Sequence, residues 1–180
     1  KFISAALGNT TDTVYLGKSA TESRIKASPL HLYRVLAFAT HGLIAGEQAG
    51  LKEPALLFTP PQTTTEEDDG LLTASEITQL KLNADWVLLS ACNTAAGNSA
   101  SATGLSGLAK AFFYAGARSL LVSHWKVNSE ATVQLITGIF DNMKKGNDLS
   151  RAQALQQSML NLLNRKEYKH PAYWAPFVIV

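Results

Sequence analysis

The sequence has a single cysteine, Cys92, among its 180 residues. One cysteine cannot form a disulfide within the chain, so nothing in it requires an oxidising compartment. No apolar run approaches the ~20 residues that cross a bilayer, and no secretory signal pattern is visible. We therefore expect a cytoplasmic protein that does not contact a membrane.

Charge is also sparse: charged residues make up 17% of the chain and the formal net charge is +2. A nucleic-acid-binding face needs clustered lysines and arginines, so no nucleic-acid contact is expected. No His, Cys or carboxylate pair has metal-ligand spacing, and the Gly-x-Gly-x-x-Gly, Gly-Lys-Ser/Thr and Gly-x-Ser-x-Gly signatures are missing. We expect no metal and no cofactor.

The remaining composition is globular, since 46% of the residues are hydrophobic. A chain of this length predicts one domain, residues 1–180, with a substantial core. The chain begins at Lys1 rather than Met and ends on the apolar run "FVIV". We therefore expect a fragment of a longer polypeptide.

Apolar runs rich in β-forming residues alternate with helical patterns, which predicts an α/β fold with a mostly parallel sheet. Capping boxes and terminal glycines mark the helix ends. Strands are expected at Thr13–Leu16, Arg34–Thr40, Pro54–Thr59, Asp85–Ala91, Arg118–Trp125 and Ala175–Val180. Helices are expected at Ser19–Ala27, Thr73–Leu80, Gly104–Ala117 (C-capped by Gly116), Ser129–Lys145 and Ser150–Leu163.

Three further features have structural interpretations. Gly107 and Gly138 fall inside expected helices, which indicates close packing against the sheet. Pro60–Gly70 is a polar loop that carries the densest charge run, "EEDD". It is expected to be solvated and accessible to proteases, and it is a candidate flexible flap or self-cleavage segment.

Two reactive residues stand where predicted strands end. His41 follows "LAFAT" and Cys92 follows "VLLSA". In open parallel sheets ligands bind beyond the carboxyl ends of the strands, and neighbouring strands would bring the two residues within about 5 to 10 Å. His41 would take the thiol proton and return one to the leaving amine, while the N–H groups of Gly42 and Cys92 would stabilise an oxyanion.

Structural roles remain open for the same residues. A lone cysteine in an apolar strand is often a small buried hydrophobe, and a lone histidine is often a hydrogen-bonded structural residue. Of the other histidines, His31 precedes a strand and is at the wrong end for catalysis. His124 follows a strand on the Cys92 edge and could line a pocket, and His170 is expected to anchor a loop.

Several blocks together resemble one family. "LAFATHG", "DGLLTASEI", "ADWVLLSACNT", "GLAKAFFYAGARSLLVSHWKV", "EAT" and "HPAYWAPFVIV" resemble, in order, the blocks of CHAT domains. These caspase-like domains usually follow tetratricopeptide repeats in bacterial proteins. The resemblance implies a caspase-like three-layer sandwich with a mostly parallel central sheet and helices on both faces. It also implies a cysteine endopeptidase related to caspases, separases and gingipains, with His41 as base and Cys92 as nucleophile.

The sequence departs from the family where the substrate is expected to bind. Asn93 stands where Glu is common, His124-Trp125-Lys126-Val127 replaces a block often reading Leu-Trp-Pro-Val, and Asn128 replaces an Asp. Asn93, Ser123, His124 and Trp125 are the candidate substrate-binding residues, and the lost negative charges do not support a strongly basic preference before the scissile bond. The expected partners are a protein or peptide substrate and controlling repeats in the same full-length chain.

Two other functions remain open. The chain could be a non-catalytic caspase-like interaction or signalling module, because nothing in the sequence shows that the site is assembled. It could also be a small-molecule hydrolase that uses the same sheet edge.

Overall fold

The computed structural model describes residues 2–7, 14–48, 50–90, 107–125, 127–145 and 149–180. They belong to two compact units. One unit comprises Leu16–Lys126 with Val180, and the other comprises Lys1–Tyr15 with Val127–Ile179. His41, Gly42 and Ser123 to Trp125 all lie in the first unit.

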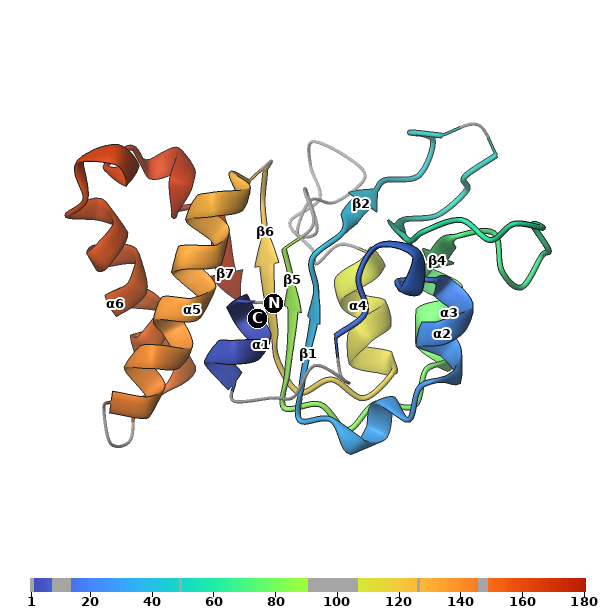
Figure 1. The fold of residues 1–180 in the computed structure, drawn as a ribbon, viewed down its shortest axis with the longest axis horizontal. Coiled ribbons are helices and arrows are strands. Elements are labelled where there is room, and N and C mark those ends of the chain that lie inside the picture. Colours follow the sequence, from blue (N-terminus) through green and yellow to red (C-terminus); the bar gives the residue numbers. More distant parts are fainter. Residues whose placement is uncertain (1, 8–13, 49, 91–106, 126, 146–148) are drawn as a thin grey trace. The chain divides into compact units, whose positions relative to one another are not determined.

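The first unit is built on a parallel sheet, in which β5 (Trp86–Leu89) lies between β1 (Val35–Phe38) and β6 (Leu120–Ser123). Figure 1 shows the three arrows side by side and pointing the same way. Val180 and Leu120 exchange two backbone hydrogen bonds, the reciprocal pattern of an antiparallel pair. The sheet is therefore mostly parallel, and its carboxyl edge is the edge at which β1, β5 and β6 end.

A second, antiparallel sheet follows directly on β1. Its strands β2 (His41–Leu43), β3 (Ala55–Leu57) and β4 (Leu71–Thr73) are hydrogen-bonded in that order. Gly42 lies opposite Leu56, and Leu56 lies opposite Leu72. The chain thus leaves the parallel sheet at Phe38 and enters another sheet three residues later, at His41.

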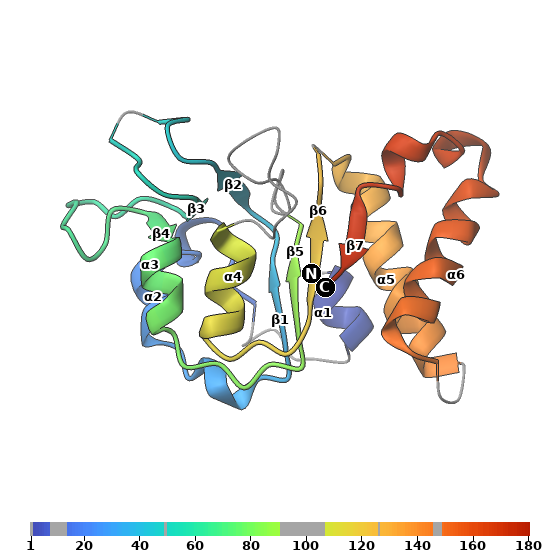
Figure 2. The ribbon, with the colours of Figure 1, turned by 180° about the vertical axis from the view of Figure 1, so that it is seen from behind.

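Short helices complete this unit: η2 (Gly17–Ser19), α2 (Glu22–Ala27), η3 (Leu30–Leu32), α3 (Ala74–Gln79) and α4 (Gly107–Tyr114). Thr73 and Glu76 form the predicted capping box of α3. Gly116, with φ +110°, ends α4 in a Schellman motif, because its N–H bonds to Phe113 O and that of Ala117 to Phe112 O. Figure 2 shows α3 and α4 side by side.

The core of this unit lies around β5, whose four residues are all buried. Phe38 of β1 and Phe112 of α4 are also buried, and their ring centroids are 5.3 Å apart. A strand without a polar face is typical of a central parallel strand covered on both sides. The apolar run "WVLL" is therefore explained by its central place in the sheet.

The second unit is mainly helical and comprises α1 (Phe2–Leu7), α5 (Ser129–Lys145), α6 (Arg151–Leu163), η4 (Lys166–Tyr168), η5 (Pro171–Tyr173) and β7 (Phe177–Ile179). Ser150 and Gln153 form the predicted capping box of α6. α5 packs along α6, and a Cβ added to Gly138 of α5 would lie 2.5 Å from the Ser158 Oγ of α6. Gly138 thus permits the close approach of two helices.

The predicted fold class is confirmed, because the protein is α/β with a mostly parallel sheet, consistent with a caspase-like three-layer sandwich. The bounds of α5 agree with the predicted Ser129–Lys145. The predicted strands at Pro54–Thr59, Asp85–Ala91, Arg118–Trp125 and Ala175–Val180 correspond to the shorter β3, β5, β6 and β7.

Four predictions about individual elements were wrong. Val14–Leu16 form no strand in the described chain, and half of the Leu16 side chain is exposed. α2 is capped by Thr21, two residues after the predicted Ser19, because Thr21 Oγ1 accepts from the Arg24 N–H while the Ser19 hydroxyl donates to Leu16 O. The expected strand Arg34–Thr40 stops at Phe38.

The fourth wrong prediction concerns glycine packing. Gly138 packs against a helix rather than the sheet, and a Cβ added to Gly107 would lie 3.1 Å from the Pro54 Cγ, just before β3. Both glycines do mark close approaches, as expected, but the partners are neighbouring helix or loop atoms. A periodic sequence pattern cannot tell which neighbour fills the space.

Candidate functional site

His41 lies at the carboxyl edge of the parallel sheet, where β1 passes into β2. Its side chain is exposed, and as the first residue of β2 it lies opposite Leu57 of β3. The preceding Thr40 donates its hydroxyl to Leu57 O, which holds the turn between the two strands. His41 is therefore carried on a strand end fixed to two sheets.

The ends of β1 and β5 are joined at the same edge. Phe38 is the register partner of Leu89, and the Ser90 N–H donates to Phe38 O at 3.2 Å. His41 is the third residue after Phe38, and Cys92 is the third residue after Leu89 in the sequence. Cys92 and Asn93 lie outside the described residues, so their roles stay predictions.

The backbone of Gly42 points away from β3. Hydrogen bonds Ala74 N to Pro54 O and Phe58 N to Gly70 O show that the even-numbered residues of β3 bond to β4. In an antiparallel sheet bonding alternates from residue to residue, so Ala55 and Leu57 bond to β2. Their partners are Leu43 and His41. Gly42, between these partners, thus turns its N–H and C=O to the outer edge of β2.

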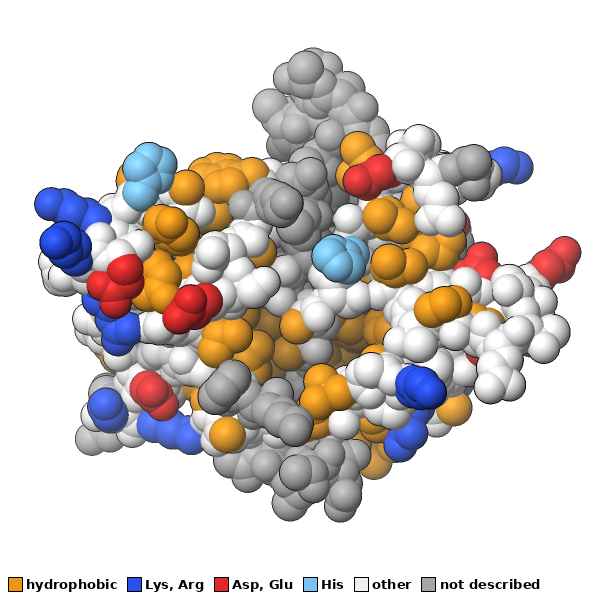
Figure 3. Space-filling model, turned by 45° about the horizontal axis from the view of Figure 1, so that its top comes forward, with side chains coloured by type: hydrophobic (Ala, Val, Ile, Leu, Met, Phe, Trp, Pro, Cys, Tyr) orange, Lys and Arg blue, Asp and Glu red, His pale blue; other side chains and the backbone are white. Residues whose placement is uncertain are grey.

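The candidate substrate-binding residues after β6 differ in exposure. Ser123 is fully buried at the end of the strand, whereas His124 and Trp125 are exposed, Trp125 to 43%. Because β5 and β6 are parallel, these residues leave the sheet at the carboxyl edge. Figure 3 turns this end of the strands toward the viewer and shows histidine and hydrophobic side chains at the surface. Of the three residues, only His124 and Trp125 present exposed side chains.

His31 lies in η3, just before β1, and so at the amino edge of the sheet, as predicted. It lines a cavity of about 620 Å³ with Lys26 and Lys81.

An ion-pair cluster also lies at the amino edge of the sheet, where the Asp85 carboxylate is 2.5 Å from the Arg34 guanidinium and 2.8 Å from that of Arg118. The Arg34 hydrogen bond, aided by both charges and opposed by burial, holds the pKa of Asp85 below its usual value. This cluster ties the starts of β1, β5 and β6 together.

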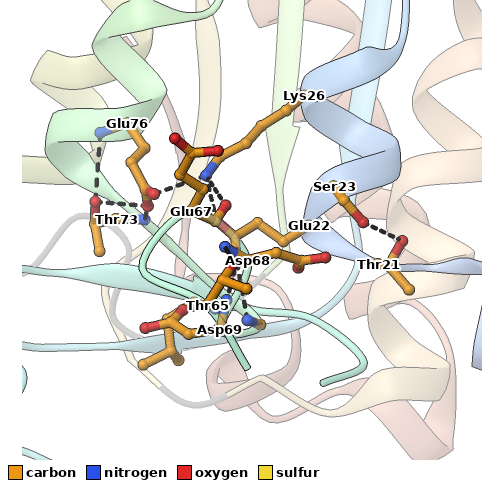
Figure 4. A network of polar contacts seen from close by, with 12 residues as sticks. Thr21, Glu22, Ser23, Lys26, Thr65, Glu67, Asp68, Asp69, Thr73 and Glu76 are labelled. Carbon is orange, nitrogen blue, oxygen red and sulfur yellow. Dashed lines mark hydrogen bonds and ion pairs between the residues drawn. The ribbon is translucent and has the colours of Figure 1, made fainter. Parts of the chain in front are cut away.

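A polar network at the carboxyl end of the Pro60–Gly70 loop was not predicted from the sequence. The Glu22 carboxylate is fully buried, and its Oε2 accepts the N–H groups of Asp69 and Gly70 at 3.0 and 2.8 Å. Its Oε1 lies 2.5 Å from Lys26 Nζ. Figure 4 shows Glu22 and Lys26 beside the loop residues that they bind. The loop is thus anchored at its carboxyl end by the network.

Lys26 links this loop to α3. Its Nζ donates to Glu67 O at 2.6 Å and to Glu76 Oε1 at 2.7 Å. Burial alone would lower the pKa of Lys26, but Glu22 and Glu76 together raise it above its usual value. Burial likewise opposes ionisation of Glu76, but hydrogen bonds from Lys26 and Thr73 lower its pKa. The ionised forms of Lys26 and Glu76 are therefore the stable ones. In the sequence, the signal for this network was the i, i+4 spacing of Glu22 and Lys26.

A metal centre and a membrane-spanning helix are both absent from the described residues. No group of three or more His, Cys, Asp or Glu side chains in these segments has an arrangement that could hold a metal ion. None of the helices within the described chain is both long enough and apolar enough to cross a membrane.

The two sheets and the strand-end His41-Gly42 define an α/β protein consistent with the caspase-like fold. The chain belongs to the CHAT domain family, which it matches over residues 1–180. The family resemblance inferred from the quoted sequence blocks is therefore confirmed.

Two curated relatives are mammalian. The chain is 27% identical over 195 residues to Tetratricopeptide repeat protein 28 of Mus musculus and 26% identical over 195 residues to that of Homo sapiens. Each alignment covers 92% of this chain and 8% of the relative, so the chain spans about a twelfth of their length. Their names agree with the expected association with tetratricopeptide repeats. These names state no peptidase activity, and a bacterial origin, which the family resemblance implies, stays a prediction.

Proposed function

We propose that residues 1–180 form a cysteine endopeptidase domain in which His41 and Cys92 act as a dyad. The observation that carries the proposal is the hydrogen bond from Ser90 N–H to Phe38 O, which joins the ends of β1 and β5. His41 and Cys92 follow these joined ends at equal distances along the chain. Family membership supports the same assignment.

In the proposed reaction His41 takes the proton from the Cys92 thiol, and the thiolate attacks the carbonyl carbon of the scissile peptide bond. The N–H groups of Gly42 and Cys92 bind the oxyanion that forms. His41 then protonates the leaving amine as the C–N bond breaks. A water molecule, deprotonated by His41, hydrolyses the thioester and restores the thiol. The outward direction of the Gly42 N–H supports its part in this scheme.

The proposed substrate is a protein or peptide held beside the dyad by Asn93, Ser123, His124 and Trp125. Because Ser123 is buried, its contribution is through the backbone or by positioning, whereas His124 and Trp125 offer side chains. We place the domain in a longer cytoplasmic chain whose tetratricopeptide repeats control it. The names of the relatives support the association with repeats.

Cleavage of a proteome-derived peptide library tests the proposal. Wild-type protein should generate new peptide termini detectable by mass spectrometry, and Cys92→Ala should generate no more termini than buffer alone. As a control for folding, the wild type and Cys92→Ala should unfold at the same urea concentration. The full-length chain should be tested beside the 180-residue domain, because the repeats are proposed to control activity. If neither cleaves, the non-catalytic interaction module is the better account, and turnover of small esters alone would favour a small-molecule hydrolase.

A further inference from the structure

We propose that the outer edge of β2 binds the substrate segment that follows the scissile bond, as a short parallel β-pairing through Gly42. This inference rests on the proposed peptidase function and adds a substrate class to it. The substrate would be an extended chain with a free N–H on the second residue after the cut.

The first support is the outer edge of β2, which no other described strand pairs with. β2 is the terminal strand of the β2-β3-β4 sheet, and Gly42 turns both its N–H and its C=O outward. Among the described residues, no backbone hydrogen bond from or to Gly42 is found at this edge. An exposed strand edge with unpaired donors and acceptors is a template on which an extended peptide can add a strand.

The second support is the short length of the edge. Bonding alternates along β2, so the next outward residue after Gly42 is Ile44. The Ile44 N–H already donates to the Glu47 carboxylate at 2.9 Å. The Ile44 N–H is therefore not available to a substrate, so pairing is limited to the N–H and C=O of Gly42. Such a short contact would select substrates whose backbone is extended next to the scissile bond, and it would not select a long sequence motif.

The third support is the direction of the edge. In both Figure 1 and Figure 2, β4 lies on the side of β2 away from β5 and β6, so the outer edge of β2 faces the ends of those strands. His124 and Trp125, which we assign to the amino side of the substrate, directly follow β6. In both views the β2 arrow points away from β5 and β6, so a chain that begins at the end of β6 and continues past Gly42 would run in the same direction as β2, which gives parallel pairing.

Parallel pairing predicts which substrate groups are bound. In a parallel ladder one residue bonds to the residues before and after its opposite neighbour. If the Gly42 N–H binds the carbonyl of the residue before the scissile bond (P1), the Gly42 C=O accepts the N–H of the second residue after it (P2′). The N–H of the following residue, P3′, points away. The exposed Ile44 provides apolar surface further along the same edge.

N-methylated peptides test this assignment. One peptide cleaved in the library experiment is resynthesised with an N-methyl group at P2′ or, as the matched control, at P3′. Methylation at P2′ removes the donor to Gly42 and should lower kcat/KM at least about fivefold, the value of one lost hydrogen bond. Methylation at P3′ should leave kcat/KM within about twofold.

The outcomes separate the inference from the function on which it depends. If the P2′ peptide is cleaved as fast as the unmodified one, or if both methylated peptides slow equally, the pairing is wrong while the peptidase function stands. Absence of any cleavage in the library experiment would overturn the peptidase function and the pairing together.

Discussion

Replacing His41 with alanine is expected to lower kcat/KM for a cleaved peptide by about 10²- to 10⁴-fold, the usual contribution of a general acid–base residue. His41 is assigned two proton transfers, from the Cys92 thiol and to the leaving amine, and a thiol without a base is only a few per cent thiolate at neutral pH. The measurement is the steady-state rate with one library-derived peptide.

His31 provides a matched control for this substitution. It precedes β1 at the amino edge of the sheet, whereas His41 opens β2 at the carboxyl edge. His31→Ala should keep kcat/KM within about twofold of wild type. Both histidines are exposed, so neither substitution should change the free energy of unfolding by more than about 0.5 kcal/mol. A His41→Ala protein that cleaves at the wild-type rate would contradict the assignment.

Replacing Glu22 with alanine is expected to destabilise the protein by about 2 to 4 kcal/mol, because two backbone N–H groups lose their charged acceptor. The substitution removes the acceptor of the Asp69 and Gly70 N–H groups and the nearest carboxylate of Lys26. Urea-induced unfolding measures the loss. The Pro60–Gly70 segment should also be cut faster by an added protease, because its anchor is gone.

The neighbouring Glu67 is a suitable control for Glu22. Its side chain is exposed, and only its backbone carbonyl contacts Lys26. Glu67→Ala should therefore change the free energy of unfolding by less than about 0.5 kcal/mol. Glu22→Gln, which keeps one acceptor oxygen, should fall between the two. If Glu22→Ala unfolds at the wild-type urea concentration, the network does not hold the loop.

The elements best predicted from sequence are those whose ends carry their own local signals. α5 spans the predicted Ser129–Lys145, and the boxes at Thr73 and Ser150 cap α3 and α6 through contacts three residues apart. Where two caps compete, local signals fail. Ser19 and Thr21 both precede Glu22. The box predicted at Ser19 would need the Glu22 carboxylate to accept the Ser19 N–H, but that carboxylate accepts from Asp69 and Gly70, and the Ser19 N–H donates to Leu16 O.

The second sheet was harder to foresee. β2, β3 and β4 have three residues each, too short for a two-residue periodicity to be distinguished from a loop. Their pairing depends on contacts between distant parts of the chain. For the same reason the outward direction of the Gly42 backbone could be obtained only from the register of β2 and β3.

The candidate site was only partly accessible to sequence reasoning. The strand-end places of His41 and His124 followed from apolar runs that stop before them, and the structure has both at the carboxyl edge. The burial of Ser123 could not be foreseen, because its neighbours His124 and Trp125 are exposed. The Glu22 network was missed because its members are brought together only by folding.

The most direct test of the central claim, that His41 activates the Cys92 thiol, is the rate of iodoacetamide alkylation of Cys92 in wild type and in His41→Ala. It needs no substrate, and Cys92 is the single thiol. At pH 7 the wild type should react at least about tenfold faster than His41→Ala, and at pH 9.5 the rates should converge as any free thiol ionises. Equal rates at pH 7 would contradict the claim.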